Sequence, residues 1–281
     1  MTTTTTSRAG GAAERVGVVR VRCAGREAAE DWLAEEVPVA LVFNGISHAV
    51  MLATPADLED FALGFGLTEG LLAGPQELYG VEVQDDDPAG LRVEMEVAAA
   101  CFARLKERRR TLAGRTGCGL CGTESLSQVE PPLAPLPARA LAVRIDPLAV
   151  ARALSALHAA QDLQHRTGAT HAAAWCALDG TVQVLREDVG RHNALDKLVG
   201  ALVSAGVDRT DGFCCITSRA SVEMVRKAVA AGMGALVAVS APTARAVRTA
   251  HASGLALAGF ARDDGMVLYA GAERFRASPG D

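Results

Sequence analysis

The sequence has few aromatic residues and no long apolar run. Aromatic side chains make up 4% of the 281 residues, whereas 49% are hydrophobic, chiefly Ala, Val and Leu. Small apolar side chains of this kind favour tightly packed α/β layers. No apolar stretch approaches the roughly 18 residues that a membrane-spanning helix needs, and residues 1–11 lack the apolar core of a signal peptide. We therefore expect a soluble, cytoplasmic protein with no membrane partner.

The chain also lacks a strong charge of either sign and a regular cysteine framework. Its net charge of −5 argues against a nucleic-acid partner. The seven cysteines are odd in number and irregularly spaced, unlike the disulfide framework of a small secreted protein. A zinc site would need a second ligand pair, and no further CxxC or HxxxH accompanies Cys118 and Cys121. We expect no structural metal.

A cluster of prolines divides the chain. Pro131, Pro132, Pro135 and Pro137 form a run that neither a helix interior nor a central strand tolerates. We place a linker there and expect an N-terminal α+β region before it and an α/β domain after it, the whole preceded by a disordered tail. The predicted segments are 1–14 for the tail, 15–130 for the first region, 131–138 for the linker and 139–281 for the second domain.

Periodicity and turn residues predict the elements of the first region. Asn44-Gly45 is a strong hairpin turn signal between two strands, and Pro55 suits the first position of a helix. The predicted strands are 16–22, 37–43, 47–52, 81–83 and 91–97, and the predicted helices are 55–72 and 98–110.

The second domain alternates between strands and helices, which predicts a parallel sheet. Asp179-Gly180 marks a hairpin at its start. The predicted strands are 171–178, 181–186, 213–217, 235–240, 255–259 and an edge strand 266–270. The predicted helices are 147–167, 193–204, 221–231 and 243–253.

Parallel sheets bind ligands outside the carboxyl ends of their strands, and three loops leave such ends here. Two of them lead into helix N-termini, whose free N–H groups attract anions. Arg219 adds a guanidinium suited to phosphate, beside the hydroxyl of Ser218. The loops are Thr217-Ser218-Arg219, residues 240–243, and Phe260-Ala261-Arg262-Asp263-Asp264-Gly265. In the third loop the Phe offers a stacking face, and either Asp can accept from purine N–H groups.

These loops have two explanations that spacing alone does not separate. One is a nucleotide pocket, and the other is ordinary capped helices with a turn. The same holds at residues 188–193, where His192 is a candidate ligand contact but can equally be a structural donor at a helix start. Asp188 can act there as an N-cap.

The CxxC segment does not have the pattern of a hydrophobic-core element. Cys118 and Cys121 stand among Gly117, Gly119 and Gly122, so the backbone is mobile or sharply turned. Clustered positive charge before it favours thiolate over thiol. That charge comes from Arg104, Lys106, Arg108, Arg109, Arg110 and Arg115. Sulfur carriage and thiol–disulfide exchange both remain open, as does a guanine-nucleotide binding module that does not use the thiols.

Several long motifs, in this order, resemble the formate dehydrogenase accessory sulfurtransferases, the FdhD family. The resemblance spans roughly residues 35–269. Its motifs are ATPADLEDFALGF at 53–65, LTEG at 67–70, GCGLCG at 117–122, EDVGRHN at 187–193, TSRASVEM at 217–224 and VSAPT at 239–243. So many motifs in one order are far more specific than an isolated CxxC.

The resemblance implies a sulfur carrier. Such a protein takes persulfide sulfur from a cysteine desulfurase and passes it to the molybdenum bis(molybdopterin guanine dinucleotide) cofactor for the catalytic subunit of formate dehydrogenase. The persulfide cysteine corresponds to Cys118, with Cys121 as a helper, and the cofactor-binding turn corresponds to 260–265. The implied fold is a cytidine-deaminase-like layered sheet with helices, joined to an N-terminal α+β region that carries the CxxC loop. Deamination itself is not expected, because His171-Ala-Ala173 lacks the acid–base Glu. A homodimer is left open.

Overall fold

The computed structural model describes residues 11–112, 133–262 and 265–276. Cys118 and Cys121 therefore lie outside the described residues, as do Asp263 and Asp264. Within the described ranges the strands form three sheets, of two, four and six strands. No helix among them is both long and apolar enough to cross a bilayer.

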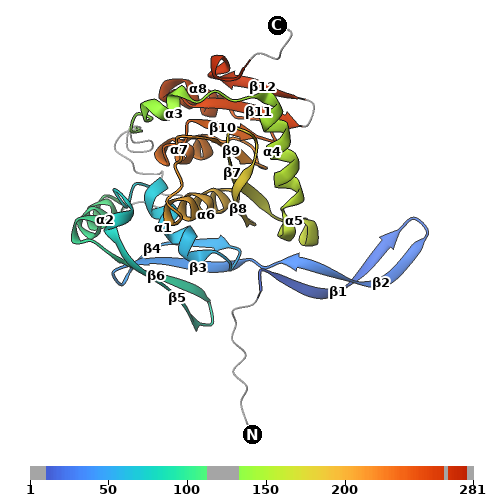
Figure 1. Ribbon diagram of the computed structural model, residues 1–281. Coiled ribbons are helices and arrows are strands. Elements are labelled where there is room, and N and C mark those ends of the chain that lie inside the picture. The colour runs from blue at the N-terminus through green and yellow to red at the C-terminus, as the bar shows by residue number, and fades with distance from the viewer. Residues whose placement is uncertain (1–10, 113–132, 263–264, 277–281) are drawn as a thin grey trace.

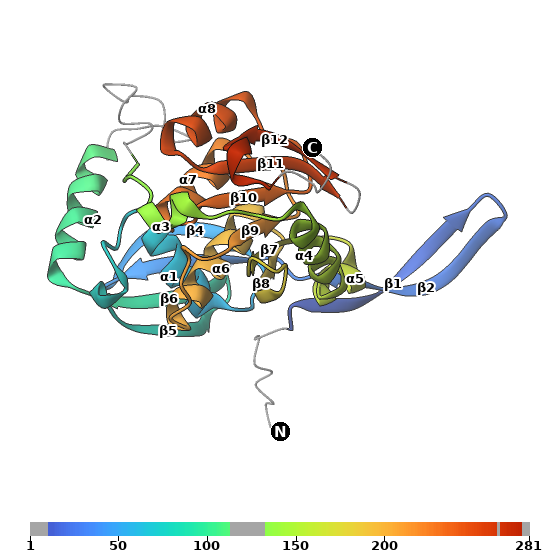
Figure 2. The same ribbon diagram turned by 45° about the horizontal axis from the view of Figure 1, so that its top comes forward.

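The two-stranded sheet is a hairpin arm that projects from the body of the molecule (Figures 1 and 2). It consists of β1 (Ala13–Arg22) and β2 (Gly25–Ala34), paired antiparallel. The sequence predicted part of β1 but not β2, because GREAAEDWLA has neither alternation nor β-branched residues. The arm contacts the body through Trp32, whose ring lies 4.3 Å from the guanidinium carbon of Arg166.

The four-stranded sheet forms the core of the N-terminal region. The predicted hairpin turn is present, with Asn44 and Gly45 both in the left-handed region at φ 45° and 76°. The strand order is β4-β3-β6-β5, and β3 runs parallel to β6. The strands are β3 (Val37–Phe43), β4 (Ile46–Ala53), β5 (Leu78–Asp87) and β6 (Gly90–Val97).

Two helices pack against this sheet in a shared core, α1 (Leu58–Thr68) and α2 (Ala99–Leu112). The predicted start at Pro55 is wrong: α1 begins after Asp57, which adopts φ 52° as the N-cap. A short 3-10 turn, η1 (Pro75–Glu77), precedes β5. Helix α1 then packs against the C-terminal domain.

Before the six-stranded sheet the chain forms three helices. The predicted single helix over 147–167 is wrong, because the chain breaks at Ala160 and Gln161. The break separates two helices. The helices are α3 (Ala138–Ala142), α4 (Pro147–Ala159) and α5 (Asp162–Thr167).

The six-stranded sheet has the order β12-β11-β10-β9-β7-β8. The three strands predicted to be parallel, β9, β10 and β11, are parallel. The β7–β8 hairpin and the edge strand β12 join them antiparallel. The strands are β7 (His171–Cys176), β8 (Val182–Asp188), β9 (Phe213–Ile216), β10 (Ala235–Ala238), β11 (Ala256–Arg262) and β12 (Gly265–Ala270), followed by the 3-10 turn η3 (Ala272–Arg274).

Helices cover both faces of this sheet (Figure 2). One core lies under α6 (Arg191–Ser204), α7 (Val222–Ala230) and α8 (Ala244–Ser253), and a second lies under α4. Helix α6 also supports α1. A Cβ at Gly64 would lie 1.7 Å from the carbonyl oxygen of Asp196, and one at Gly200 would lie 1.9 Å from that of Asp60. Glycine thus lets the two helix backbones touch.

Candidate functional site

The predicted strand-end loops meet at one edge of the six-stranded sheet. Because β9, β10 and β11 are parallel, their carboxyl ends share this edge, and the antiparallel β7 starts there. The Thr217 N–H donates to the carbonyl of Ala172 at 3.0 Å, and the Phe260 N–H donates to that of Ser240 at 3.2 Å. The segments predicted separately are therefore neighbours.

Three helices begin at this edge. Thr243 caps α8, its hydroxyl accepting from the Ala246 N–H at 3.2 Å. Helix α6 begins after Gly190, which has no side chain to cap it. Helix α7 begins after Ser221, whose hydroxyl makes no capping bond. The edge thus combines loop side chains with the positive ends of helix dipoles.

Ser218 and Arg219 sit differently within the first loop. Ser218 is buried, and its hydroxyl donates to the carbonyl of Arg219 at 3.1 Å. The Arg219 side chain is exposed. The guanidinium is therefore the group of this loop that is open to a ligand, whereas the serine hydroxyl shapes the loop.

His192 lies in the first turn of α6, partly buried. Burial, together with the charges of Arg191 and Lys227, lowers the pKa of His192 to about 4. Its Nε2 is buried without a hydrogen-bond partner in the part of the chain that is described. At neutral pH the site therefore holds a neutral imidazole with an unused nitrogen.

Four residues of the third predicted loop lie in strands, and Asp263 and Asp264 lie outside the described residues. Phe260, Ala261 and Arg262 belong to β11, where a bulge between Gly259 and Arg262 places Phe260 at φ 51°. Phe260 is 46% exposed. Ala261 is buried, Arg262 is exposed, and Gly265 begins β12. The bulge turns the aromatic ring outward while the next residue enters the core.

The basic residues predicted to surround the thiols are only partly described. The guanidinium of Arg104 pairs with Glu77 and donates to the carbonyl of Leu71 at 3.1 Å. Lys106 lies 4.3 Å from the ring centroid of Phe102. These two cations therefore contact the N-terminal region around α2. The side chains of Arg108, Arg109, Arg110 and Arg115 lie outside the described residues.

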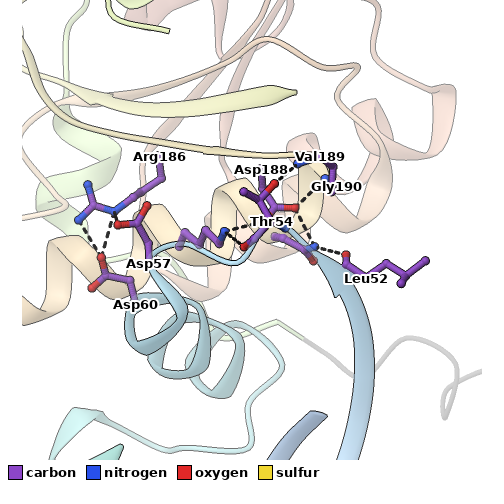
Figure 3. Close-up of polar contacts among 10 residues, drawn as sticks. Leu52, Thr54, Asp57, Asp60, Arg186, Asp188, Val189 and Gly190 are labelled. Atoms are coloured by element: carbon purple, nitrogen blue, oxygen red, sulfur yellow. Dashed lines mark hydrogen bonds and ion pairs between the residues drawn. The ribbon is translucent and has the colours of Figure 1, made fainter. Parts of the chain in front are cut away.

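The motif over 187–193 joins the two halves of the molecule, which the sequence did not reveal (Figure 3). The carboxylate of Asp188 is fully buried and lies 2.6 Å from the Lys197 ammonium. It accepts from the Thr54 N–H at 3.0 Å and from the Gly190 N–H at 2.7 Å. Asp188 is not the N-cap of α6, because Gly190 takes that position. The sequence signal for this contact was the charged Lys197 among the apolar residues Leu195, Leu198 and Val199.

A second set of buried polar contacts between the two halves lies nearby. We call the contacts around Lys197 and Asp188 the first joint, and those around Lys227 and Asp196 the second joint. Lys227 of α7 contacts the carboxylates of Asp196 and Glu69 at 2.9 and 2.7 Å, and the Thr68 hydroxyl at 3.0 Å. Burial raises the pKa of the Asp196 carboxyl, and the Thr68 hydroxyl donates to it at 2.6 Å. Both joints link α1 and the strand before it to the C-terminal domain.

Sequence reasoning also missed a cavity at the same sheet edge, on the face covered by α4 and α5. Its volume is about 780 Å³. Gln161, at the break between the two helices, lines it together with His171, Thr217 and Arg262. No sequence signal marked it, because a helical pattern runs continuously through the break.

Known proteins match the chain over nearly its whole length. A model described as the FdhD/NarQ family matches residues 34–276. A sulfur carrier protein FdhD of Variovorax paradoxus is 56% identical over 270 residues, which cover 96% of this chain and 95% of that protein. A protein of the same description from Cupriavidus necator is 57% identical over 246 residues, covering 88% and 84%.

A solved structure has the same fold. It is the crystal structure of a Desulfotalea psychrophila protein described as a formate dehydrogenase accessory protein, with a TM-score of 0.73 and 22% identity. The alignment covers 94% of this chain and 99% of that one. This likeness confirms the mixed α/β arrangement of sheets and helices.

Proposed function

Because this chain belongs to the FdhD/NarQ family, we propose that it acts as a sulfur carrier in the maturation of formate dehydrogenase. It takes persulfide sulfur from a cysteine desulfurase and passes it to the molybdenum bis(molybdopterin guanine dinucleotide) cofactor, its substrate. The formate dehydrogenase catalytic subunit then receives the cofactor. We place this chemistry in the cytoplasm.

Sulfur loading is a thiol exchange at Cys118. The Cys118 thiolate attacks the outer sulfur of the donor persulfide, a new S–S bond forms, and the donor cysteine leaves as a thiolate. No net oxidation occurs in this step. A neighbourhood rich in arginine supports it, because positive charge stabilises both the attacking and the leaving thiolate.

Sulfur delivery in the form of sulfide takes a pair of electrons, and we assign their supply to Cys121. Its thiolate attacks the inner sulfur of the Cys118 persulfide, releases hydrosulfide and leaves a disulfide between the two cysteines. A thiol reductant then reopens this disulfide. This gives the helper cysteine a defined role that is separate from loading.

The observation that carries the proposal is the gathering of the candidate cofactor contacts at one sheet edge. Arg219 and Arg262 are exposed there and suit phosphate. The outward ring of Phe260 offers a face for stacking, and His192 offers an unused nitrogen. We assign the nucleotide arms of the cofactor to this edge and to the adjoining segment 260–265, which includes Asp263, Asp264 and Gly265.

We also propose that the six-stranded sheet is a cytidine-deaminase-like layer, supported by its mixed strand order with helices on both faces. The N-terminal region of residues 15–130 then carries the thiol segment, and residues 139–281 bind the cofactor. After the thiol segment the described chain resumes at Leu133, which packs against the core under α6 to α8. The linker of residues 131–138 thus ends on the cofactor-binding domain.

Sulfur loading tests the proposal. We expect incubation with a cysteine desulfurase and cysteine to add one sulfur atom to Cys118, measured by mass spectrometry. Cys118→Ala should accept none and should fail to support formate dehydrogenase activity. Cys121→Ala should still be loaded. Cys23→Ala, at the exposed tip of the arm, is the matched control and should behave as wild type. Loading and activity retained in Cys118→Ala would refute the assignment.

A further inference from the structure

The first residue of helix α6 is a partly buried arginine without a partner. The Nε of Arg191 is buried and has no hydrogen-bond partner among the residues that the structure describes. Within the same residues its guanidinium forms no ion pair. Burying a cation without compensation is costly. An anion that joined Arg191 would remove that cost.

Other partly or fully buried arginines of the protein do have partners. Arg186 pairs with Asp60 at 2.7 Å, and Arg209 and Arg274 donate to backbone carbonyls. The fold therefore satisfies arginines at similar depth with its own groups. Arg191 differs from them, which indicates that its counter-group comes from outside the described chain.

Two further buried polar atoms without hydrogen bonds lie close to Arg191. They are Nε2 of His192, the next residue of α6, and Oγ of Ser221, the N-cap of α7. The Ser221 hydroxyl lies beside the Glu223 carboxyl and lowers its pKa, as do the charges of His192 and Arg191, but it forms no hydrogen bond of ordinary geometry. The three groups are therefore neighbours, and they come from the starts of two helices.

The electrostatic surroundings of this cluster favour a negative charge. Burial is the largest cause of the low pKa of His192, and the charges of Arg191 and Lys227 add to it, outweighing those of Glu223 and Glu69. Helices α6 and α7 begin here without a side-chain cap, so their free N–H groups and dipoles add positive potential.

The chemistry of the three atoms restricts the anion further. A guanidinium Nε, a neutral imidazole Nε2 and a serine hydroxyl can each donate a hydrogen bond. Because all three atoms are buried, their common partner must be small. Arg219 and Arg262 are exposed and can meet a bulky phosphate, whereas the buried Nε of Arg191 cannot.

We propose that Arg191, His192 and Ser221 form a binding site for a small monovalent anion, whose natural occupant is hydrosulfide. The identity of the occupant rests on the proposed function, in which Cys121 releases hydrosulfide from the Cys118 persulfide. Binding itself makes and breaks no covalent bond and moves no proton or electron. The site holds the released sulfur near the cofactor and keeps it from escaping into solution.

Bromide, a monovalent anion of similar size, is the first probe. In wild type it should raise the pKa of His192 from about 4 along a saturable curve, measured by NMR of the ring at constant ionic strength, because a bound negative charge favours imidazolium. Arg191→Met should lose this response. Arg248→Met, which removes an exposed arginine of α8, should keep it. A wild type without a saturable response overturns the inference, as does an unchanged response in Arg191→Met.

Two other variants and the sulfur anion itself extend this test. Ser221→Ala should weaken bromide binding about 10-fold, through loss of one hydrogen bond to a charged group. Arg191→Lys keeps the charge and should retain part of the response, which guards against a folding defect of the methionine variant. Sodium hydrosulfide at mildly alkaline pH should shift the Arg191 Nε–H resonance and compete with bromide. Failure to compete would overturn hydrosulfide as the occupant.

Stability separates an anion site from a structural role. Arg191→Met removes an uncompensated cation, so the midpoint of urea denaturation should not fall. Bromide should raise that midpoint in wild type and leave it unchanged in Arg191→Met, because a ligand stabilises only the form that binds it. A marked loss of stability in Arg191→Met without bromide would show that the guanidinium is structural, and would overturn the inference.

Failure of this inference is distinguishable from failure of the proposed function. Arg191→Met should load Cys118 with sulfur as wild type does, but should release more free sulfide into solution and support less formate dehydrogenase activity. Normal loading without a bromide response would overturn the anion site alone. Absent loading in wild type would overturn the sulfur carrier, and with it hydrosulfide as the occupant, whatever the bromide results.

Discussion

Two buried lysines join the N-terminal region to the C-terminal domain, and the protein holds them differently. Lys197 and Asp188 form a pair whose side chains are both 0% exposed. The side chain of Lys227 is 8% exposed and lies between Asp196, at 2%, and Glu69, at 45%. The first pair is closed to solvent, whereas the second reaches the surface through Glu69.

The surroundings of the two lysines differ as well. Backbone groups make most of the contacts of the first joint: Lys197 donates to the Thr54 carbonyl at 2.9 Å, and Asp188 accepts from two backbone N–H groups and from the Asn193 amide at 3.0 Å. Side chains complete the second, and the charge of Lys227 also acts on His192. The first joint therefore fixes how the two halves sit together, and the second controls charge beside the candidate site.

The largest expected effect is that of Lys197→Met. This change leaves the Asp188 carboxylate buried without a cation, and breaking a buried pair in this way costs about 3–5 kcal/mol. We expect a loss of that size in the free energy of unfolding, measured by urea denaturation. A loss below about 1 kcal/mol would contradict the description of this joint as closed.

Two further variants sharpen this result. Lys106→Met removes an exposed lysine of α2 and should change stability by less than about 0.5 kcal/mol. Lys197→Met combined with Asp188→Asn removes both charges and should regain part of the loss. If the double variant is no more stable than Lys197→Met, the uncompensated carboxylate is not the cause.

The sequence predicted the β9–α7–β10–α8–β11 alternation because each element there is signalled locally. Short buried strands follow one another, and Gly232 and Gly254 end the helices between them. The joints could not be predicted in this way. Thr54 and Asp188 lie far apart in the chain, and their contact exists only after α1 has packed on α6.

Two further features, strand β2 and the helix break at Gln161, could not be predicted from the sequence for physical reasons. Strand β2 is held by its pairing with β1 rather than by its own composition. The break at Gln161 follows from tertiary contacts, because the carboxylate of Glu187, in strand β8, accepts from two N–H groups in the first turn of α5. Gln161, at that break, lines the cavity. For the candidate site, the sequence identified the loops and Arg219. It did not reveal that the Ser218 hydroxyl donates to a backbone carbonyl of its own loop.

Lys227→Met should have a smaller effect than Lys197→Met, about 2 kcal/mol. Asp196 still accepts from the Thr68 hydroxyl, and burial already raises the pKa of its carboxyl, so that it can take up a proton instead of staying charged. Equal losses for the two methionine variants in urea denaturation would remove the distinction between the two joints.

Alkaline pH provides a second measurement on the same variant. Burial lowers the pKa of Lys227, but the charges of Asp196 and Glu69 outweigh it and hold the pKa above the ordinary 10.5. The folded state therefore keeps this proton longer than the unfolded chain. The resulting stability is present below pH 10.5 and is lost as the pH rises through the folded-state pKa. Wild type should show this loss relative to Lys227→Met.

The smallest expected effect concerns His192 and acidic pH. Its pKa is about 4 in the folded protein, against an ordinary value of 6.5, so the unfolded chain takes up a proton first as the pH falls. Stability should decrease by about 1–2 kcal/mol from pH 6.5 to pH 4 in wild type relative to His192→Gln, a range discounted for partial exposure of the ring.

Titration of the His192 ring by NMR connects this effect to the comparison of the two lysines. Burial is the largest cause of its low pKa, followed by the charges of Arg191 and Lys227. Lys227→Met removes one of those charges and should raise the pKa of His192, whereas Lys197→Met should leave it unchanged if the fold is kept. A pKa that moves equally in both variants would show that the second joint has no special control over the charge at the site. A pKa that moves only in Lys227→Met would establish that control at a single titrating group.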